Sequence, residues 1–261
     1  EFYVAGHFFE AAVAHYRMTK GQDDRVLNIA IKLADYLDRE FGPYPKRNVV
    51  PGHEEVELGL VKLANLMDEI NGAGAGDRYW KLAKFFTDMR GDYEDRDSNY
   101  RGGTYSQDNV KLVDANDAVG HSVRFGYFVS GATDIALIND DPDYKAALLR
   151  LWDSAVNRKM YVTGAWGTVG NGSDSEGFGP DYYLPSNNTY AETCATISNA
   201  MWEQRMNLLF NEGKYIDVME TALYNGVLAS ADIGGTKFYY TNYIDSSNTP
   251  DRSGWFGWAC C

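Results

Sequence analysis

The feature that most constrains this fold is a run of amphipathic segments in which apolar residues recur every three or four positions. In the first segment Phe8, Ala12 and Tyr16 fall on one face, as expected of a helix that covers a core. Breaks that contain Gly, Asp or Pro separate the segments, and strands do not alternate with helices. Eight helices are predicted, over residues 1–20, 25–41, a segment through Val61, Leu63 and Met67, 79–89, 114–130, 143–160, 193–210 and 213–230.

Helices joined by short turns form hairpins, and hairpins stacked side by side predict an all-α fold. The stack is either an open solenoid or a closed toroid of the α/α-barrel type. Eight helices make four hairpins, whereas a toroid of six hairpins needs twelve helices, so we expect a fragment of a longer enzyme. Short β segments are expected in loops, one of them at 237–244, where apolar and polar residues alternate.

The acidic composition restricts the partners that this chain can have. Its 261 residues suffice for one large domain, and the formal net charge is −13. That charge argues against nucleic acid and anionic membranes as partners, and no apolar run reaches the length of a membrane span. Thiols kept for metal binding suit a reducing compartment, so a cytoplasmic location is expected, with secretion as the alternative.

The three cysteines of the chain suggest a metal site. Cys194 follows Glu192 by two residues, and Cys260 and Cys261 are adjacent. One carboxylate and three thiolates form a donor set that fits Zn²⁺ best. Glu192 and Cys194 point to the same side only where the backbone is extended or just entering a helix. The alternative is a buried Cys194 without metal, followed by an unrelated pair of cysteines.

Several motifs, spread over almost the entire chain, resemble glycoside hydrolase family 127, whose founding activity is β-L-arabinofuranosidase. They are Gly6-His7, Val119-Gly120-His121, Tyr161-Val162-Thr163-Gly164, Leu184-Pro185, Tyr190-Ala191-Glu192-Thr193-Cys194-Ala195, the segment 222–229 and the ending 255–261. The resemblance implies an (α/α)6 barrel followed by β-sandwich domains. Residues 1–261 would then be a partial (α/α)6 catalytic barrel that lacks the first barrel helices and the C-terminal β-sandwich domains.

The resemblance also assigns chemical roles. Members of this family use a zinc-bound cysteine as the glycosidic nucleophile, and Cys260 matches it. Glu192, Cys194 and Cys261 match the remaining zinc ligands. Glu176, in a glycine-rich loop, matches the general acid/base. A metal that keeps the thiol deprotonated at neutral pH makes this use of sulfur chemically reasonable.

Four further residues match positions that contact the sugar. His7, His53 and His121 each follow a glycine, where backbone can approach closely, and Tyr240 is another candidate. The implied substrates are β-L-arabinofuranosides or related plant cell-wall sugars. The implied assembly is a homodimer of the full-length protein.

Two other functions are compatible with the residues themselves. The first is a non-catalytic helical scaffold whose zinc is structural, because zinc with four protein ligands is normally closed. The second is a sugar epimerase on a similar helical toroid, with histidines as acid and base.

Overall fold

The computed structural model describes residues 2–97, 101–168, 176–187, 189–245 and 251–254. Among these residues are the helices α1 (Phe2–Met18), α2 (Arg25–Glu40), α3 (Val56–Asn71), α4 (Asp77–Asp88), α5 (Ser122–Asn139), α6 (Pro142–Trp152), α7 (Thr193–Phe210) and α8 (Gly213–Ala222). π-Helical turns continue α6 and α8 at Asp153–Arg158 and Leu223–Leu228, and 3-10 turns lie at Thr104–Ser106 and Leu112–Asp114. The strands β1 (Lys237–Phe238) and β2 (Ser253–Gly254) pair antiparallel.

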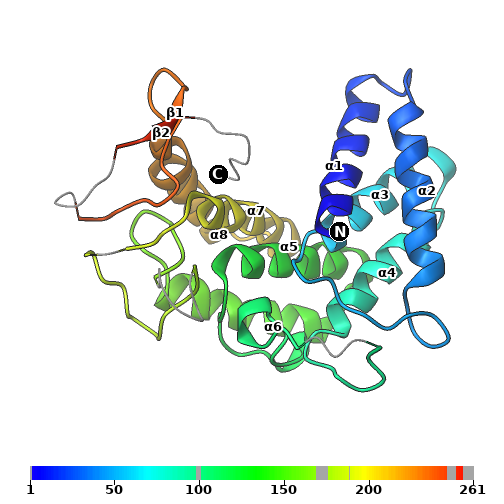
Figure 1. The fold of residues 1–261 in the computed structure, drawn as a ribbon, viewed down its shortest axis with the longest axis horizontal. Helices are drawn as coiled ribbons and strands as arrows, with labels where there is room; N and C mark the ends of the chain where they lie inside the picture. The colour runs from blue at the N-terminus through cyan, green and yellow to red at the C-terminus, as the bar shows by residue number, and fades with distance from the viewer. Residues whose placement is uncertain (1, 98–100, 169–175, 188, 246–250, 255–261) are drawn as a thin grey trace.

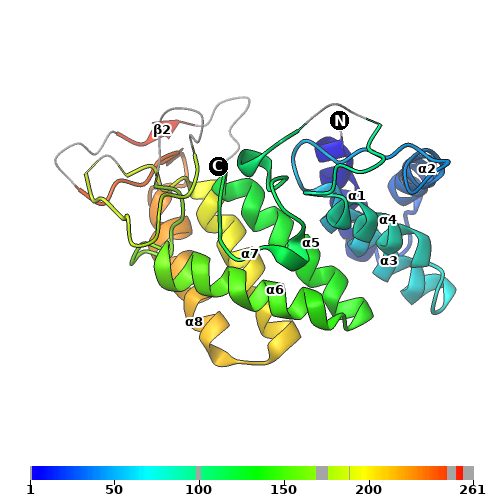
Figure 2. The same cartoon turned by 90° about the horizontal axis from the view of Figure 1, so that it is seen from below.

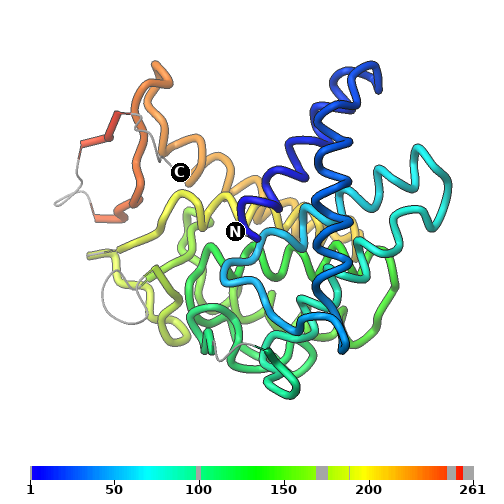
Figure 3. Tube along the Cα trace, turned by 45° about the vertical axis from the view of Figure 1, so that its right-hand side comes forward, coloured from blue at the N-terminus to red at the C-terminus, as the bar shows by residue number. Residues whose placement is uncertain are grey.

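The helices form two layers of an arc (Figure 1). In the inner layer α1 packs on α3, α3 on α5, and α5 on α7. In the outer layer α2, α4, α6 and α8 each pack on the odd-numbered helix that precedes them (Figure 2). Figure 3 shows the two arms of the arc, α1 with α2 on one side and α8 with β1 on the other. Each hairpin returns the chain, so successive inner helices begin on the same side of the fold.

Four aromatic side chains pack two residues of the glycine-rich loop, Trp166 and Phe178, against the inner layer. Phe125 of α5, Trp202 of α7, and Trp166 and Phe178 of the loop pack with ring centroids 5.2–6.0 Å apart. Both tryptophans are fully buried. A dense apolar contact of this kind leaves little freedom to the backbone that it anchors. The segment that carries Glu176 is therefore held by the core rather than by solvent-exposed turns.

The structure confirms the all-α prediction and most of the predicted helices, with two corrections. The helix predicted over 114–130 is wrong in its first half, because α5 begins only at Ser122. Ala118 is buried by tertiary contact, and its N–H donates to Ser154 Oγ at 2.9 Å instead of to a helical carbonyl. The strand predicted over 237–244 ends at Phe238, because β2 pairs only with Lys237 and Phe238, and further along Tyr240 O accepts a hydrogen bond from Thr193 N instead.

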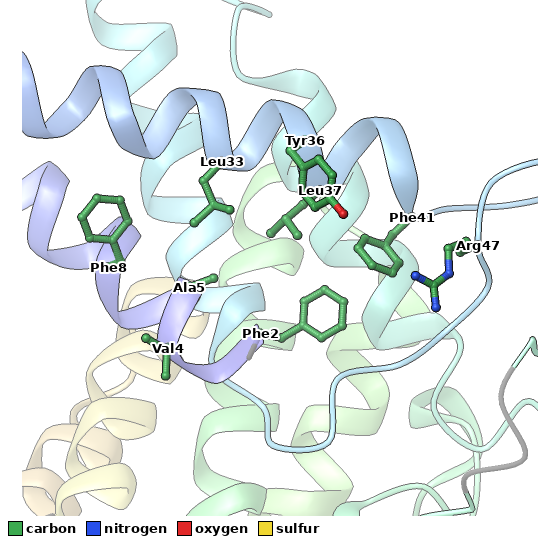
Figure 4. Close-up of a pocket in the computed structure, with 9 residues that line it drawn as sticks. All are labelled: Phe2, Val4, Ala5, Phe8, Leu33, Tyr36, Leu37, Phe41 and Arg47. Atoms are coloured by element: carbon green, nitrogen blue, oxygen red, sulfur yellow. The ribbon is translucent and has the colours of Figure 1, made fainter.

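An apolar groove of about 590 Å³ lies between α1 and α2 (Figure 4). Its lining is Phe2, Val4, Ala5, Phe8, Leu33, Tyr36, Leu37, Phe41 and Arg47. Arg47 is the one charged residue of this lining, so the groove offers no pair of groups for acid–base chemistry. No helix in the described part of the chain is long and apolar enough to cross a membrane.

Candidate active site

Three inner helices begin at one place, and a polar residue stands at each beginning. Glu55 precedes α3, His121 precedes α5 and Glu192 precedes α7, each at the N-cap position. The N-terminus of a helix carries a partial positive charge from its aligned peptide dipoles. This partial charge favours anionic groups at the helix ends, an effect that burial outweighs at Glu55, whose pKa is raised.

Glu176 of the glycine-rich loop lies at the start of α5. Glu176 O accepts hydrogen bonds from Ser122 N at 3.0 Å and Ser122 Oγ at 2.7 Å, and Phe178 N donates to Gly120 O at 3.0 Å. Position 120 requires glycine, because φ is +73° and a Cβ there would lie 1.8 Å from Thr104 O, in the 3-10 turn that packs against it. These contacts bring the side chains of two distant segments within bonding distance.

The carboxylate of Glu176 is held from two sides. Oε2 lies 2.7 Å from His121 Nε2, and Oε1 accepts a hydrogen bond from the Tyr190 hydroxyl at 2.8 Å. Burial and this bond to Glu176 raise the pKa of Tyr190, so the hydroxyl stays protonated and donates. Glu176 has a left-handed backbone, with φ +65°, a conformation that costs free energy and is found most often at functional sites.

The tautomer of His121 follows from its hydrogen bonds. Val123 N donates to Nδ1 at 3.2 Å, so Nδ1 carries no proton and Nε2–H points to Glu176. Burial lowers the pKa of His121, and the charge of Arg124 lowers it further, against the opposing effect of Glu176. A neutral imidazole with both nitrogens engaged orients Glu176.

Glu192 lies beside this pair. Ligand atoms of His121, Glu176 and Glu192 all fall within 4.8 Å of one another. Glu192 is buried, its backbone is extended with φ −60° and ψ 139°, and it bridges to Thr241. Two carboxylates from different segments therefore face one small space.

A row of rings extends from His121 along the inner helix ends. The ring of His53 lies 6.1 Å from that of His121 and 4.6 Å from that of Tyr3, and Tyr3 lies 4.5 Å from His7. His53 Nδ1 donates to Glu54 O at 2.7 Å, which leaves Nε2 as a hydrogen-bond acceptor. Burial lowers the pKa of His53 to about 3, so the ring is neutral. Aromatic faces with polar ring edges are typical of sugar-binding surfaces.

The chain matches known proteins over its whole length. The family model described as the β-L-arabinofuranosidase GH127 catalytic domain matches residues 1–261. The non-reducing end β-L-arabinofuranosidase of Bifidobacterium longum is 35% identical over 100% of this chain and 42% of its own length. The chain belongs to glycoside hydrolase family 127.

Two solved family 127 structures resemble the fold closely. A GH127 β-arabinofuranosidase superposes with a TM-score of 0.88 at 40% identity, covering 100% of this chain and 38% of that one. A GH127 β-L-arabinofuranosidase from Geobacillus stearothermophilus T6 gives a TM-score of 0.89 at 36% identity, with 100% and 43% coverage. The match confirms the (α/α)6-barrel class. The chain spans about two fifths of the length of these relatives.

The structure brings together many of the residues that the sequence singled out. Glu176, His121 and Glu192 form one cluster, and His53 and His7 continue it through the row of rings. The ring of Tyr240 lies 6.5 Å from that of Tyr190. Cys194 is half-buried in the first turn of α7. The remaining two predicted zinc ligands, Cys260 and Cys261, lie outside the described residues.

The start of α7 carries two of the four predicted zinc ligands, Glu192 and Cys194. Glu192 is extended and α7 begins one residue later, the one backbone arrangement in which we expect Glu192 and Cys194 to serve the same ion. The group of close ligand atoms described around Glu192 consists of His121, Glu176 and Glu192. An oxygen and a sulfur donor at this position are of the types that Zn²⁺ accepts.

Sequence reasoning missed several members of the site. Tyr3, Tyr127 and Tyr190 contact the predicted histidines or Glu176, and Glu55 contacts His7. Tyr3 precedes His7 by four residues, and residues at that spacing share a helix face, so local periodicity identifies it. The histidine contact of Glu55 has no local signature.

Proposed function

We propose that this chain carries the catalytic site of a retaining β-L-arabinofuranosidase. The observation that supports this function is the convergence of His121, Glu176 and Glu192 at the beginnings of α5 and α7, in a chain of family 127. The substrates proposed are β-L-arabinofuranosides, as the names of the relatives indicate.

Glu176 is proposed as the general acid/base. In the first step it protonates the glycosidic oxygen as the aglycone leaves. In the second step the same group removes a proton from the water that attacks the anomeric carbon. His121 and Tyr190 fix the orientation of its carboxyl group through bonds of 2.7 and 2.8 Å, which keeps both oxygens near the sugar.

Cys260 is proposed as the nucleophile, with Glu192, Cys194, Cys260 and Cys261 as the residues that hold Zn²⁺. A bound zinc ion keeps coordinating thiols deprotonated at neutral pH. Attack by the Cys260 sulfur on the anomeric carbon releases the aglycone, and water activated by Glu176 then cleaves the carbon–sulfur bond. Two displacements at one carbon retain its configuration.

The row of rings is proposed to hold the sugar. His53 offers Nε2 as an acceptor for a sugar hydroxyl, while Tyr3 and Tyr127 offer aromatic faces. Tyr240 lies near Tyr190 and is proposed as a contact from the opposite side. Both ring nitrogens of His121 contact protein groups, Val123 N and Glu176 Oε2. The predicted contact between His121 and the sugar is therefore untested by this structure.

The test compares two adjacent cysteines. The intact protein is incubated with p-nitrophenyl β-L-arabinofuranoside, and Cys260→Ser and Cys261→Ser are assayed for turnover and, by elemental analysis, for bound zinc. Cys260→Ser should abolish turnover while leaving the other ligands to retain metal. Glu203→Gln, about 16 Å along α7 from Glu192, is the control with normal turnover.

The alternatives make different predictions in the same experiment. A structural-zinc scaffold shows metal but no release of p-nitrophenol from any furanoside. An epimerase isomerises the free sugar without releasing an aglycone, and removal of zinc leaves that reaction intact. Either result rejects the proposed hydrolase.

A further inference from the structure

His7 and Glu55 form a second histidine–carboxyl pair at the far end of the row of rings. His7 Nδ1 lies 3.1 Å from Glu55 Oε1. The histidine side chain is 44% exposed, while the carboxyl group is fully buried beneath it. The exposed histidine edge is the part of this pair that a ligand can reach.

Close packing of α1 against α3 creates the pair. A Cβ added to Gly6 would lie 2.7 Å from Glu55 Cγ, and one added to Gly59 would lie 2.5 Å from Gly6 O. The helices can approach this closely because both positions are glycine and carry no Cβ. The side chain of Glu55 is fully buried at this close contact.

The surroundings of Glu55 favour its neutral form. Burial raises the pKa of Glu55 to about 9, and the neighbouring charges of Glu10 and Glu57 raise it, against the opposing charges of Lys62 and Arg205. These charged groups come from α1, α3 and α7, and the Tyr127 hydroxyl of α5 also faces the carboxyl group.

His7 is neutral as well. Burial lowers the pKa of His7, and the charge of Lys62 lowers it further, while that of Glu10 opposes. A neutral carboxyl group has one O–H to donate, and a neutral imidazole has one bare ring nitrogen to accept it. The 3.1 Å separation of His7 Nδ1 and Glu55 Oε1 is short enough for an O–H···N hydrogen bond between them.

We propose that Glu55 is a positioning residue that donates its carboxyl proton to a hydrogen bond with His7 Nδ1 and so presents His7 Nε2–H to a sugar hydroxyl. The proposal rests on the proposed function, since the sugar is the ligand of that site. It gives the two histidines on either side of Tyr3, His53 and His7, opposite polarity, because His53 offers a bare Nε2 as an acceptor. A vicinal pair of hydroxyl groups, one accepting and one donating, is complementary to that pattern.

The same residues are less suited to a metal ion. Ligand atoms of His7, Glu10 and Glu55 lie within 4.8 Å of one another. The ammonium group of Lys62, however, is ion-paired with Glu10, and a fixed cation there repels a second one. A neutral Glu55 is also a poor metal ligand.

The first test reads the tautomer directly. The intact protein is labelled with ¹⁵N-histidine, and the spectrum of His7→Gln identifies the His7 signals among the four histidines. The expected result at pH 7 is an unprotonated Nδ1 and a protonated Nε2. A protonated Nδ1, or an imidazolium, overturns the proposal, whether or not the protein hydrolyses a furanoside.

The second test compares Glu55→Gln, whose amide can donate a hydrogen bond, with Glu55→Ala, whose methyl group cannot. Glu55→Gln retains a donor to Nδ1, so KM for p-nitrophenyl β-L-arabinofuranoside should stay within about threefold of the wild type. Glu55→Ala should raise KM about tenfold, with a smaller change in kcat, because one hydrogen bond to substrate is misdirected. Glu203→Gln removes another buried acid and should change neither constant.

Two kinetic outcomes contradict the proposal. If Glu55→Gln is impaired as much as Glu55→Ala, the carboxylate form is required. If Glu55→Ala binds substrate normally, Glu55 does not position His7. A wild-type protein that turns over no furanoside rejects the proposed function instead, and the tautomer of His7 still decides the role of Glu55.

Discussion

The two histidine–carboxyl pairs of the site contain the same residue types but differ in which member is more buried. In one pair the histidine, His121, is 10% exposed and the carboxyl of Glu176 is 26% exposed. In the other the carboxyl of Glu55 is fully buried and His7 is 44% exposed. Under the two proposals above, the more exposed member of each pair meets the ligand and the more buried member orients it, so burial distinguishes roles that residue type leaves open.

The largest expected effect is at the exposed acid. Glu176→Ala should lower kcat on p-nitrophenyl β-L-arabinofuranoside by about 10³-fold, because water loses its general base. The activated aglycone needs little protonation, so a burst of p-nitrophenol should precede slow turnover in stopped-flow measurements. A Glu176→Ala variant as fast as Glu55→Ala would remove the distinction between the two pairs.

The buried histidine of the first pair should rank second. His121→Asn removes the bond to Glu176 but leaves a good N-cap for α5, and should lower kcat about 10²-fold without loss of stability. His121→Ala should show the same kinetic loss together with about 1 kcal/mol lower unfolding free energy in urea, because the cap of α5 is also lost. Equal stability of the two variants would show that the N-cap bond contributes nothing.

The buried acid of the second pair should make stability depend on pH. The folded-state pKa of Glu55 is raised to about 9 from an ordinary 4.5, so the folded protein binds the extra proton throughout that range. Its contribution to stability is complete below about pH 4.5 and is lost as pH rises through 9. Relative to wild type, the unfolding free energy of Glu55→Gln should rise between pH 5 and 9, with a slope of up to about 1.4 kcal/mol per pH unit.

Glu203 provides the matched comparison for that measurement. It accepts hydrogen bonds from Trp152 Nε1 at 2.8 and 3.0 Å, and burial raises its pKa to about 8. Relative to wild type, Glu203→Gln should gain unfolding free energy between about pH 4.5 and 8, with no change in kinetics. The unfolding free energy of each variant relative to wild type is compared across pH. If this difference is constant for Glu55→Gln but rises with pH for Glu203→Gln, Glu55 is ionised in the folded protein.

The smallest expected effect is at the second donor to Glu176. Tyr190→Phe removes the 2.8 Å hydrogen bond to Oε1 but leaves His121 in place. We expect kcat to fall about tenfold, which corresponds to about 1.4 kcal/mol. Steady-state kinetics measure this change, and a loss as large as that of Glu176→Ala would make Tyr190 a participant in proton transfer.

The sequence by itself determined the helices and the identity of the chemical groups. Apolar residues at helical spacing predicted α2 and α7 almost to the residue, because 3.6-residue periodicity is a local property of the chain. Local geometry also predicted that the backbone at Glu192 and Cys194 is extended or just entering a helix, and in the structure Glu192 is extended and α7 begins at Thr193. It also identified Glu176 and the histidines as a set through their motifs.

Tertiary structure decided which of those groups meet. His121 and Glu176 are separated by 55 residues and His7 and Glu55 by 48, and no periodicity reports contacts at such distances. The segment before His121 shows the limit most clearly, since Ala118 is apolar because it is buried against α6 and its π-helical turn, not because it lies on a helix. Exposure, protonation and tautomer are properties of the packed environment, so the division of labour within each pair arises only when the inner helices come together.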